Sequence, residues 1–501
     1  MRGMSDLQNI IKILEGNGEI EQVVFPSKES LPITSIFSNS RECNPGSLFC
    51  CIQGERHDGH LFAADAVQRG AIALLCKRPL EINVPQIIVK DVRWAMGYAA
   101  ATVYDCPSEH LAMYGVTGTN GKSTSSYMMR SVLQASGEKS GLMGTIVYSD
   151  GDVEEEASRT TPESCDVQRY LARMVRNECK SATMEVSSHG AVQGRLNGCF
   201  FSGMIFTNLT PEHLDYHGDM EHYFMAKKSI FEKYVSHDWC GAINGDDEYG
   251  KRLLYEYKDC CLSYGLCSCA GHDVYPTWLE MGLSGLQMDV RLPAGESLEL
   301  DIPVTGRFNV YNALGVIALA YGVGINMPTI KRGLETMPQV PGRVEKYFFE
   351  NGVCAVVDYA HTPDALQNVL SAMREICKGR LISVFGHGGE RYHGNRPLLG
   401  QVASENADVV VVTMDNPRSE DPAQIAEEIE KGFTSSLLEH YRILNRQEAV
   451  GTALSMAHPG DMVVISGKGP EHYILLQDKR IPYNDSETIK EWGMKQGLRW
   501  Q

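Results

Sequence analysis

The sequence predicts an α/β fold in three domains: a central domain with a mostly parallel sheet around a phosphate-binding loop (P-loop), a Rossmann-like, doubly wound C-terminal domain, and a smaller N-terminal domain. Two observations support this prediction. A glycine-rich turn separates a strand from a helix at residues 115–123, and four apolar runs alternate with helical stretches after residue 350. A chain of 501 residues suits about three domains of ~150 residues. We place them at residues 1–109, 110–340 and 341–501, the last boundary lying between Pro338 and Pro341-Gly342.

Short apolar strands and helices fill the first two regions. In the first region we expect strands at Leu48–Ile52, Ala73–Leu75 and Gln86–Val89 and an amphipathic helix at Leu61–Gln68. In the second we expect strands at Ala182–Val186 and Gly203–Thr207 and a buried helix at Phe308–Tyr321.

The phosphate loop, residues 115–123, reads Gly-Val-Thr-Gly-Thr-Asn-Gly-Lys-Ser and precedes a helical pattern at Ser125–Ala135. In such a turn, backbone N–H groups and the helix N-terminus face a phosphate, while Lys122 adds charge and Ser123 can hold Mg²⁺. Val116 stands where the general pattern has its first glycine, so we expect Gly115 and Gly118 to supply the flexibility of the loop. The pattern predicts a nucleoside triphosphate site; a glycine turn with an incidental lysine is the alternative.

One carboxylate and one imidazole follow apolar strands near this loop and could complete a metal site for the triphosphate. Glu185 ends the strand at 182–186, and His213 lies in the segment 208–217. A hydrogen-bonding glutamate and a loop-capping histidine are the alternatives. Lys227 and Lys228 fall on an expected helix, Glu221–Tyr234, where a lysine pair by itself predicts a solvated face.

Four apolar runs in the C-terminal region are followed by polar segments, here called the tips: residues 358–361, 386–391, 415–418 and 466–471. Parallel strands bind ligands at their carboxyl ends, where all four tips are expected. Asp415 and Glu471 can accept hydrogen bonds from an ammonium group, and Arg391 and Arg418 can bind carboxylates. The set suits a zwitterionic ligand with more than one carboxylate; structural ion pairs are the alternative. The runs are Val353–Val357, Leu381–Phe385, Val409–Thr413 and Met462–Ile465.

Composition excludes several classes of protein. A net charge of −17 argues against binding to nucleic acid or to an anionic membrane surface. The chain has neither a signal-peptide core nor the ~18 continuous apolar residues of a membrane helix. Its 15 scattered cysteines indicate a reducing cytoplasm. Cys260, Cys261, Cys267, Cys269 and His272 cluster without zinc-site spacing, so we expect small buried side chains there, with a metal site as the alternative.

Taken together, the motifs resemble the Mur ligases of peptidoglycan synthesis, in particular the type that adds the third amino acid. The resemblance covers nearly the whole chain and extends beyond the phosphate loop and the four tips. The further motifs are Ser38–Arg41, Asp58–His60, Thr160–Pro162, Glu185–His189, Gln193–Arg195, His213–His217, Ala226-Lys227, Gly306–Asn312 and Pro341–Arg343.

The resemblance implies an ATP-dependent ligase that joins meso-diaminopimelate to UDP-N-acetylmuramoyl-L-alanyl-D-glutamate through an acyl phosphate. It implies a cytoplasmic monomer that uses ATP, Mg²⁺ and a CO₂-derived carbamate on Lys227. Three alternatives stay open: the same reaction with L-lysine, a folylpolyglutamate-synthetase-like ligase, and a non-catalytic paralogue that binds a nucleotide-sugar.

Site residues follow from the same resemblance. The catalytic residues that it implies are Lys122, Glu185, His213 and Lys227. The metal ligands that it implies are Ser123, Glu185, His213 and carbamylated Lys227. Implied ATP contacts are Gly118, Thr119, Asn120, Gly121, Lys122, Ser123, Thr124, Asn309, Asn312, Arg343, Asp358 and His361. Implied contacts to the UDP-substrate are Ser38, Ser40, Glu55, Arg56, His57, Thr160, Thr161, Ser187, Gln193 and Arg195. Implied contacts to the amino acid are Arg391, Asp415, Asn416, Pro417, Arg418, Gly467 and Glu471.

The amino-acid pocket departs from the usual family pattern at three positions. His387, Glu390 and Pro470 stand where Cys, Asp and His are commoner in the family. The Asp415–Arg418 signature, Asp-Asn-Pro-Arg, is nevertheless the one that the resemblance links to diaminopimelate. Arg418 would hold the distal carboxylate that lysine lacks.

Overall fold

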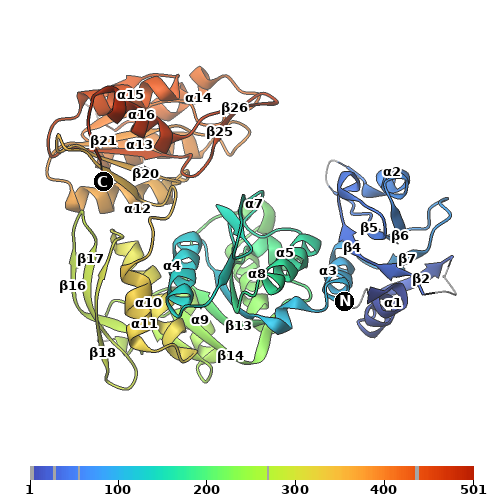
Figure 1. Cartoon of the computed structure of the whole chain (residues 1–501). Helices are drawn as coiled ribbons and strands as arrows, with labels where there is room; N and C mark the ends of the chain where they lie inside the picture. The colour runs from blue at the N-terminus through green and yellow to red at the C-terminus, as the bar shows by residue number, and fades with distance from the viewer. Residues whose placement is uncertain (1–4, 26–29, 55–56, 268–269, 435–438, 501) are drawn as a thin grey trace. The chain divides into compact units, whose positions relative to one another are not determined.

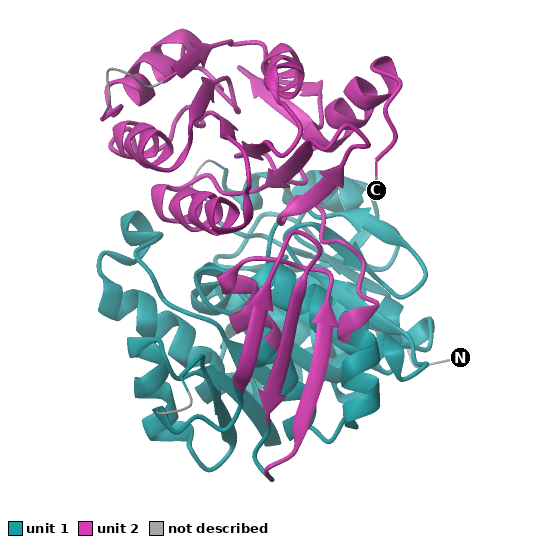
Figure 2. Ribbon diagram, turned by 90° about the vertical axis from the view of Figure 1, so that its left-hand side faces the viewer, with its two compact units in different colours: residues 1–275, 292–294, 314–333 teal, residues 276–291, 295–313, 334–501 magenta. Residues whose placement is uncertain are grey.

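The computed structural model describes residues 5–25, 30–54, 57–267, 270–434 and 439–500 (Figure 1). They form two compact units, coloured separately in Figure 2. Unit 1 comprises residues 1–275, 292–294 and 314–333, and unit 2 comprises residues 276–291, 295–313 and 334–501. Among the described residues, no helix is both long enough and apolar enough to cross a membrane. The three-domain boundaries stay a prediction.

A five-stranded sheet begins unit 1, in the order β2-β7-β6-β5-β4. Alternate strand residues face two cores: one is shared with α1 (Leu7–Gly16) and α3 (Val92–Val103), the other with α2 (Ala63–Gln68). Helix α2 starts two residues later than predicted, because Asp58 caps a 3₁₀ turn at Gly59–Phe62 by accepting a hydrogen bond from the His60 N–H. The strands are β2 (Ile20–Val24), β4 (Ser35–Phe37), β5 (Ser47–Cys50), β6 (Ala71–Cys76) and β7 (Gln86–Val89).

An eight-stranded sheet, in the order β11-β10-β9-β12-β8-β13-β14-β15, forms the rest of the unit 1 core. The six strands from β9 to β15 in this order are parallel, so their carboxyl ends share one edge. The strands are β8 (Ala112–Thr117), β9 (Ser140–Met143), β10 (Val147–Ser149), β11 (Glu154–Glu156), β12 (Ser181–Glu185), β13 (Phe201–Phe206), β14 (Val235–Asn244) and β15 (Cys261–Tyr264). The principal helices of this part are α4 (Lys122–Ala135), α5 (Ser164–Arg176), α8 (Met220–Lys233) and α9 (Glu248–Tyr257).

Unit 2 contains a six-stranded sheet, in the order β19-β20-β24-β21-β22-β23, that is parallel except for β19. Alternate residues of its central strands face opposite cores: Val356 and Val410 pack with α12, α13 and α14, whereas Val357 and Val411 pack with α15 and α16. Burial on both faces confirms the predicted doubly wound α/β fold. The strands are β19 (Glu345–Phe348), β20 (Cys354–Asp358), β21 (Leu381–Phe385), β22 (Val409–Val412), β23 (Glu439–Arg442) and β24 (Met462–Ser466). The helices are α12 (Pro363–Ile376), α13 (Asn395–Asn406), α14 (Pro422–Glu430), α15 (Arg446–Met456) and α16 (Asp485–Lys495).

The structure also contains elements that were not predicted. A three-stranded sheet consists of β16 (Tyr275–Met281), β17 (Leu286–Arg291) and β18 (Ser297–Ile302). A hairpin of β25 (Tyr473–Leu476) and β26 (Lys479–Pro482) follows the last tip. The predicted helix at 308–321 is α10 (Arg307–Gly322), and α11 (Met327–Glu335) comes after it.

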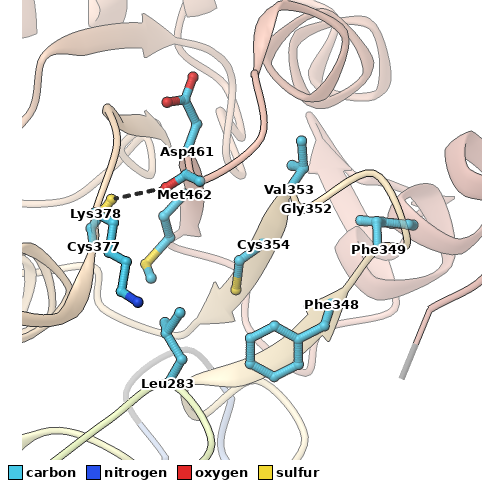
Figure 3. Close-up of a pocket in the computed structure, with 11 residues that line it drawn as sticks. Leu283, Phe348, Phe349, Gly352, Val353, Cys354, Cys377, Lys378, Asp461 and Met462 are labelled. Carbon is cyan, nitrogen blue, oxygen red and sulfur yellow. Dashed lines mark hydrogen bonds between the residues drawn. The ribbon is translucent and has the colours of Figure 1, made fainter.

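A small cavity of about 110 Å³ lies in unit 2 at the amino ends of β20 and β24 (Figure 3). Its wall is mostly apolar and includes Leu283, Phe348, Cys354 and Met462. The tips leave the opposite, carboxyl ends of the same strands. The cavity is therefore separate from the predicted ligand site.

Candidate active site

The phosphate loop of unit 1 connects β8 to α4, and two of its glycines have backbone angles that other residues rarely adopt. Gly118 has φ +146°, and a Cβ atom there would lie 1.9 Å from Thr207 Oγ1. Gly121, with φ +87°, is the residue before the first turn of α4. The expectation for Gly115 is wrong: it lies inside β8, where a Cβ atom would lie 2.3 Å from Met204 Sδ. Gly115 thus allows close packing, and Gly118 and Gly121 shape the loop.

The side chain of Lys122 folds back over this loop. Its Nζ donates hydrogen bonds to the carbonyl oxygens of Gly118 at 2.9 Å and Thr119 at 2.7 Å. Asn208, which lies just after β13, fixes the loop from the other side, because its Oδ1 accepts a hydrogen bond from the Asn120 N–H at 3.0 Å. A cation and backbone N–H groups at a helix N-terminus are suited to phosphate.

Strand register places Glu185 beside this loop. β12 pairs in parallel with β8 so that Glu185 lies opposite Val116. Its buried carboxylate accepts hydrogen bonds from Ser123 Oγ at 3.1 Å, Thr145 Oγ1 at 3.0 Å and the Thr145 N–H at 2.9 Å. A carboxylate next to a hydroxyl is an oxygen-rich set of the kind Mg²⁺ prefers. Thr145 was missed from the sequence, because no motif pointed to it.

Lys227 is buried, so the prediction of a solvated lysine face is wrong for this residue. Its side chain is 1% exposed on the inner face of α8. The Nζ atom donates a hydrogen bond to the Gly118 carbonyl oxygen at 2.8 Å and lies 4.8 Å from the centre of the Tyr223 ring. Burial, and then the charge of Lys122, lower the pKa of Lys227 well below its ordinary value. Its neighbour Lys228 faces outward and pairs with Glu256 at 2.7 Å.

His213 begins a short helix, α7 (Leu214–His217), with a left-handed φ of +56°. Its ring centre lies 4.8 Å from that of His189. Burial lowers the pKa of His213, as do the charges of Lys122 and Lys227, against the opposite effect of Glu212. The ring thus lies within electrostatic reach of both lysines of the phosphate region.

No group of three or more His, Cys, Asp or Glu residues arranged to hold a metal occurs in the described part of the chain. In the cysteine cluster, Cys269 lies outside the described residues. His272 Nε2 instead pairs with Asp246 Oδ1 at 2.9 Å. A Mg²⁺ site at the loop would therefore need Ser123 and a further oxygen ligand besides Glu185.

The predicted substrate residues from Thr160 to Arg195 lie together next to Glu185. Arg195 donates to the Thr161 carbonyl oxygen at 2.7 Å and to Gln193 Oε1 at 2.6 Å. Thr161 Oγ1 accepts a hydrogen bond from the Ser187 N–H at 3.0 Å, and Thr160 Oγ1 lies 3.0 Å from Thr145 Oγ1. These contacts form one polar network beside the phosphate loop.

The residues predicted to contact the UDP-substrate from the N-terminal part of the chain are less connected to that network. Glu55 and Arg56 lie outside the described residues. Ser38 Oγ accepts a long hydrogen bond from Cys165 Sγ at 3.8 Å, which links it to α5. Ser40 is buried in a 3₁₀ turn, and the His57 ring lies 6.5 Å from that of Phe62.

In unit 2, the residues predicted to contact nucleotide form two local groups. Asn312 Nδ2 donates to Asn309 Oδ1 at 2.9 Å across one turn of α10. Asp358 accepts hydrogen bonds from the N–H groups of Val344 and Ala360, each at 2.8 Å. The Arg343 guanidinium lies 4.8 Å from the centre of the Tyr359 ring, and the His361 ring lies in contact with the same ring, 4.8 Å between centres.

The order β20-β24-β21-β22 brings all four tips to one edge of the unit 2 sheet. A Cβ atom on Gly388 would lie 2.9 Å from Arg418 Nη1 and 3.4 Å from Arg391 Cγ, so both arginines border this glycine. Arg418 Nη1 also donates to the Gly389 carbonyl oxygen at 2.6 Å. The two predicted carboxylate-binding arginines therefore lie side by side.

The acidic residues of the tips form a second group. Asn416 Nδ2 donates to Glu471 Oε2 at 2.8 Å, and Pro417 next to it is buried. Gly467, with φ +111°, leaves room for Asp415, because a Cβ atom there would lie 2.5 Å from Asp415 Oδ2. Burial alone would raise the pKa of Asp415, but the charges of Lys468 and Arg446 lower it below its ordinary value.

Comparison with known proteins gives the same fold over most of the chain. Family models match at residues 32–112 (Mur ligase family, catalytic domain), 116–320 (Mur ligase middle domain) and 342–469 (Mur ligase, glutamate ligase domain). UDP-N-acetylmuramoyl-L-alanyl-D-glutamate–2,6-diaminopimelate ligase 1 of Clostridium acetobutylicum is 40% identical over 95% of this chain and 98% of its own. The corresponding ligase of Geobacillus thermodenitrificans is 39% identical over 91% and 94%. A solved structure of a ligase of that name is 30% identical, with a TM-score of 0.65, over 93% of this chain and 96% of its own. The chain belongs to the Mur ligase family.

Proposed function

We propose that the protein is an ATP-dependent ligase that adds meso-diaminopimelate to UDP-N-acetylmuramoyl-L-alanyl-D-glutamate in peptidoglycan precursor synthesis. The observation that supports this most is the 40% identity to a ligase of that name over 95% of the chain. ATP and UDP-linked precursors are cytoplasmic metabolites, so we propose that the protein acts in the cytoplasm, as a monomer.

In the proposed reaction the D-glutamate side-chain carboxylate attacks the γ-phosphate of ATP, forming an acyl phosphate and releasing ADP. The amine of diaminopimelate then attacks the acyl carbon, and phosphate leaves. The phosphate loop and Lys122 would bind the transferring phosphate, and Thr160, Thr161, Ser187, Gln193 and Arg195 would orient the muramoyl peptide. No nucleophilic side chain is required, so rate enhancement depends on positioning and charge stabilisation.

Ser123 and Glu185 would hold Mg²⁺, with His213 and a carbamate on Lys227 as further ligands. When bound, Mg²⁺ neutralises charge on the phosphates. A lysine must be neutral to attack CO₂, and the lowered pKa of Lys227 favours that form. Carbamylation would convert this buried cation into a carboxylate, which supplies the missing oxygen ligand.

Arg391 and Arg418 would hold the distal carboxylate of diaminopimelate, and Asp415 and Glu471 its ammonium group. L-Lysine lacks that carboxylate, so a lysine complex would leave the Arg418 guanidinium without a carboxylate partner, at a cost of about 1–3 kcal/mol. The pairing of the two arginines around Gly388 favours diaminopimelate over lysine.

Phosphate release from ATP tests the proposal. The assay contains UDP-N-acetylmuramoyl-L-alanyl-D-glutamate and meso-diaminopimelate, L-lysine or no amino acid. We expect release with diaminopimelate alone. Release with lysine alone would preserve the reaction and contradict the pocket assignment, and no release with either would favour a non-catalytic nucleotide-sugar-binding protein.

A further inference from the structure

Lys468 is a buried cation next to the predicted amino-acid pocket, and neither the motifs nor the proposed mechanism assigns it a role. Its side chain is 0% exposed. It lies between Gly467 and Glu471 in the last tip. Its Nζ atom is 2.6 Å from Glu471 Oε2 and 3.1 Å from Asn416 Oδ1, and 5.6 Å from the centre of the Tyr473 ring.

The contacts of Asn416 fix the orientation of its side-chain amide. Oδ1 accepts hydrogen bonds from Lys468 Nζ and, at 2.8 Å, from the Leu475 N–H, so this atom must be the oxygen. Nδ2 is then directed at Glu471, where it donates at 2.8 Å. Without the Lys468 ammonium, one of the two donors that hold this amide in place would be lost.

Both Lys468 and Asn416 donate to the same carboxylate oxygen, Glu471 Oε2. Within the described residues, Glu471 Oε1 makes no hydrogen bond. The Glu471 side chain is 22% exposed, so this second oxygen can be reached from solvent. Two donors on one oxygen hold the carboxylate in a single rotamer and leave the other oxygen for a ligand.

We propose that Lys468 is a positioning residue for the amino-acid substrate. Lys468 holds the side chains of Asn416 and Glu471 in place, so that Glu471 Oε1 can accept a hydrogen bond from the substrate ammonium group. This inference rests on the proposed function and adds to it a residue that does not itself touch the substrate. Loss of Lys468 should therefore weaken binding of the amino acid and leave ATP and the UDP-substrate unaffected.

The test compares the wild type with Lys468→Met, which keeps the length of the side chain and removes its charge. The exposed Lys495, at 73% side-chain exposure, gives a matched control, Lys495→Met. KM for meso-diaminopimelate, KM for ATP and for the UDP-substrate, kcat and the thermal midpoint are measured for each. Wild-type phosphate release is established first, because its absence would refute the proposed function and not the role of Lys468.

In Lys468→Met we expect KM for meso-diaminopimelate to rise about tenfold or more, as for a lost charge-assisted hydrogen bond, while the other two KM values stay within about twofold. If all three KM values rise, or if KM for meso-diaminopimelate does not rise, the proposed positioning role of Lys468 is refuted. If Lys468→Met does not fold, Lys468→Leu, which also removes the donor to Glu471, is judged by the same criterion.

A double-mutant cycle checks whether Lys468 acts through Glu471. Glu471→Gln alone should also raise KM for meso-diaminopimelate. If the proposal is right, the KM increases of Lys468→Met and Glu471→Gln will not multiply in the double variant, because the lysine has no carboxylate left to position. Multiplicative increases would show that Lys468 acts by another route and would overturn the proposal.

Discussion

At the residue scale, two adjacent lysines of α8 differ in burial and in the partners of their ammonium groups. Lys227 is buried against the phosphate loop, whereas Lys228 pairs with acidic residues on the outer face of the helix. We expect Lys227→Ala to lose activity by at least about a hundredfold, as for removal of a metal-binding or charge-stabilising group, and Lys228→Ala to keep it. Phosphate release by the two purified variants checks this prediction.

The state of Lys227 can be tested separately. If a carbamate forms there, activity of the wild type should fall in buffer depleted of CO₂ and return when bicarbonate is added. Mass analysis under non-acidic conditions should show the addition of CO₂ in the wild type and not in Lys227→Ala. Activity that does not depend on CO₂ would exclude the carbamate while leaving the ligase assignment intact.

His387, one of the departures from the family pattern, makes stability depend on pH. Burial, and then the charge of Arg396, lower the pKa of His387 to about 4. An unfolded histidine titrates near 6.5, so on acidification the unfolded state binds a proton before the folded state does. Stability should therefore fall from pH 7 to pH 5, with His387 accounting for about 2 kcal/mol.

The variant His387→Cys should lose that contribution. The difference in free energy of unfolding between variant and wild type is measured by denaturant titration at the two pH values. The matched control is His440→Gln, which replaces an exposed histidine of the same unit. Equal pH dependence of His387→Cys and the wild type would contradict the prediction.

At the element scale, one buried ion pair holds the strand ends that form the tips. Arg446, at the start of α15, makes two 2.8 Å hydrogen bonds to Asp485 at the start of α16. It also donates to the carbonyl oxygens of Met414 at 3.3 Å and Ser466 at 2.9 Å, which precede Asp415 and Gly467. Both side chains are fully buried, so the pair joins two helices to the tips that follow β22 and β24.

Breaking this pair should be costly. Arg446→Met leaves the Asp485 carboxylate buried without its partner, which costs about 3–5 kcal/mol. The double variant Arg446→Met/Asp485→Leu should recover part of that loss, since no unpaired charge remains. Thermal unfolding measures both effects, and Arg442→Met, which removes a half-exposed pairing with Glu430, should cost about 1 kcal/mol or less.

Elements with a strong local pattern could be predicted from the sequence, and contacts between distant elements could not. The run Leu381–Phe385 coincides with β21 because buried parallel strands are continuously apolar. Gly115, by contrast, was misassigned because the Met204 side chain that fills the space beside it comes from another strand. The burial of Lys227 has the same origin: spacing along α8 does not show which face meets the phosphate loop.

At the scale of the whole molecule, the predicted substrate contacts are divided between the two compact units. The phosphate loop, Glu185 and Lys227 belong to unit 1, and the four tips belong to unit 2. The acyl phosphate and the attacking amine must meet within bonding distance in the proposed reaction, so we expect the two units to close around the substrates in each turnover.

Small-angle scattering tests this expectation. We expect the radius of gyration to decrease when a non-hydrolysable ATP analogue and the UDP-substrate are added together, because ligands that contact both units favour the closed arrangement. In Lys122→Ala, weaker binding of the analogue should reduce the change, which distinguishes closure from a general effect of added ligand. An unchanged radius at saturating ligand, with binding verified by calorimetry, would mean that the units need no large movement, and that the amine reaches the acyl phosphate within a preformed arrangement.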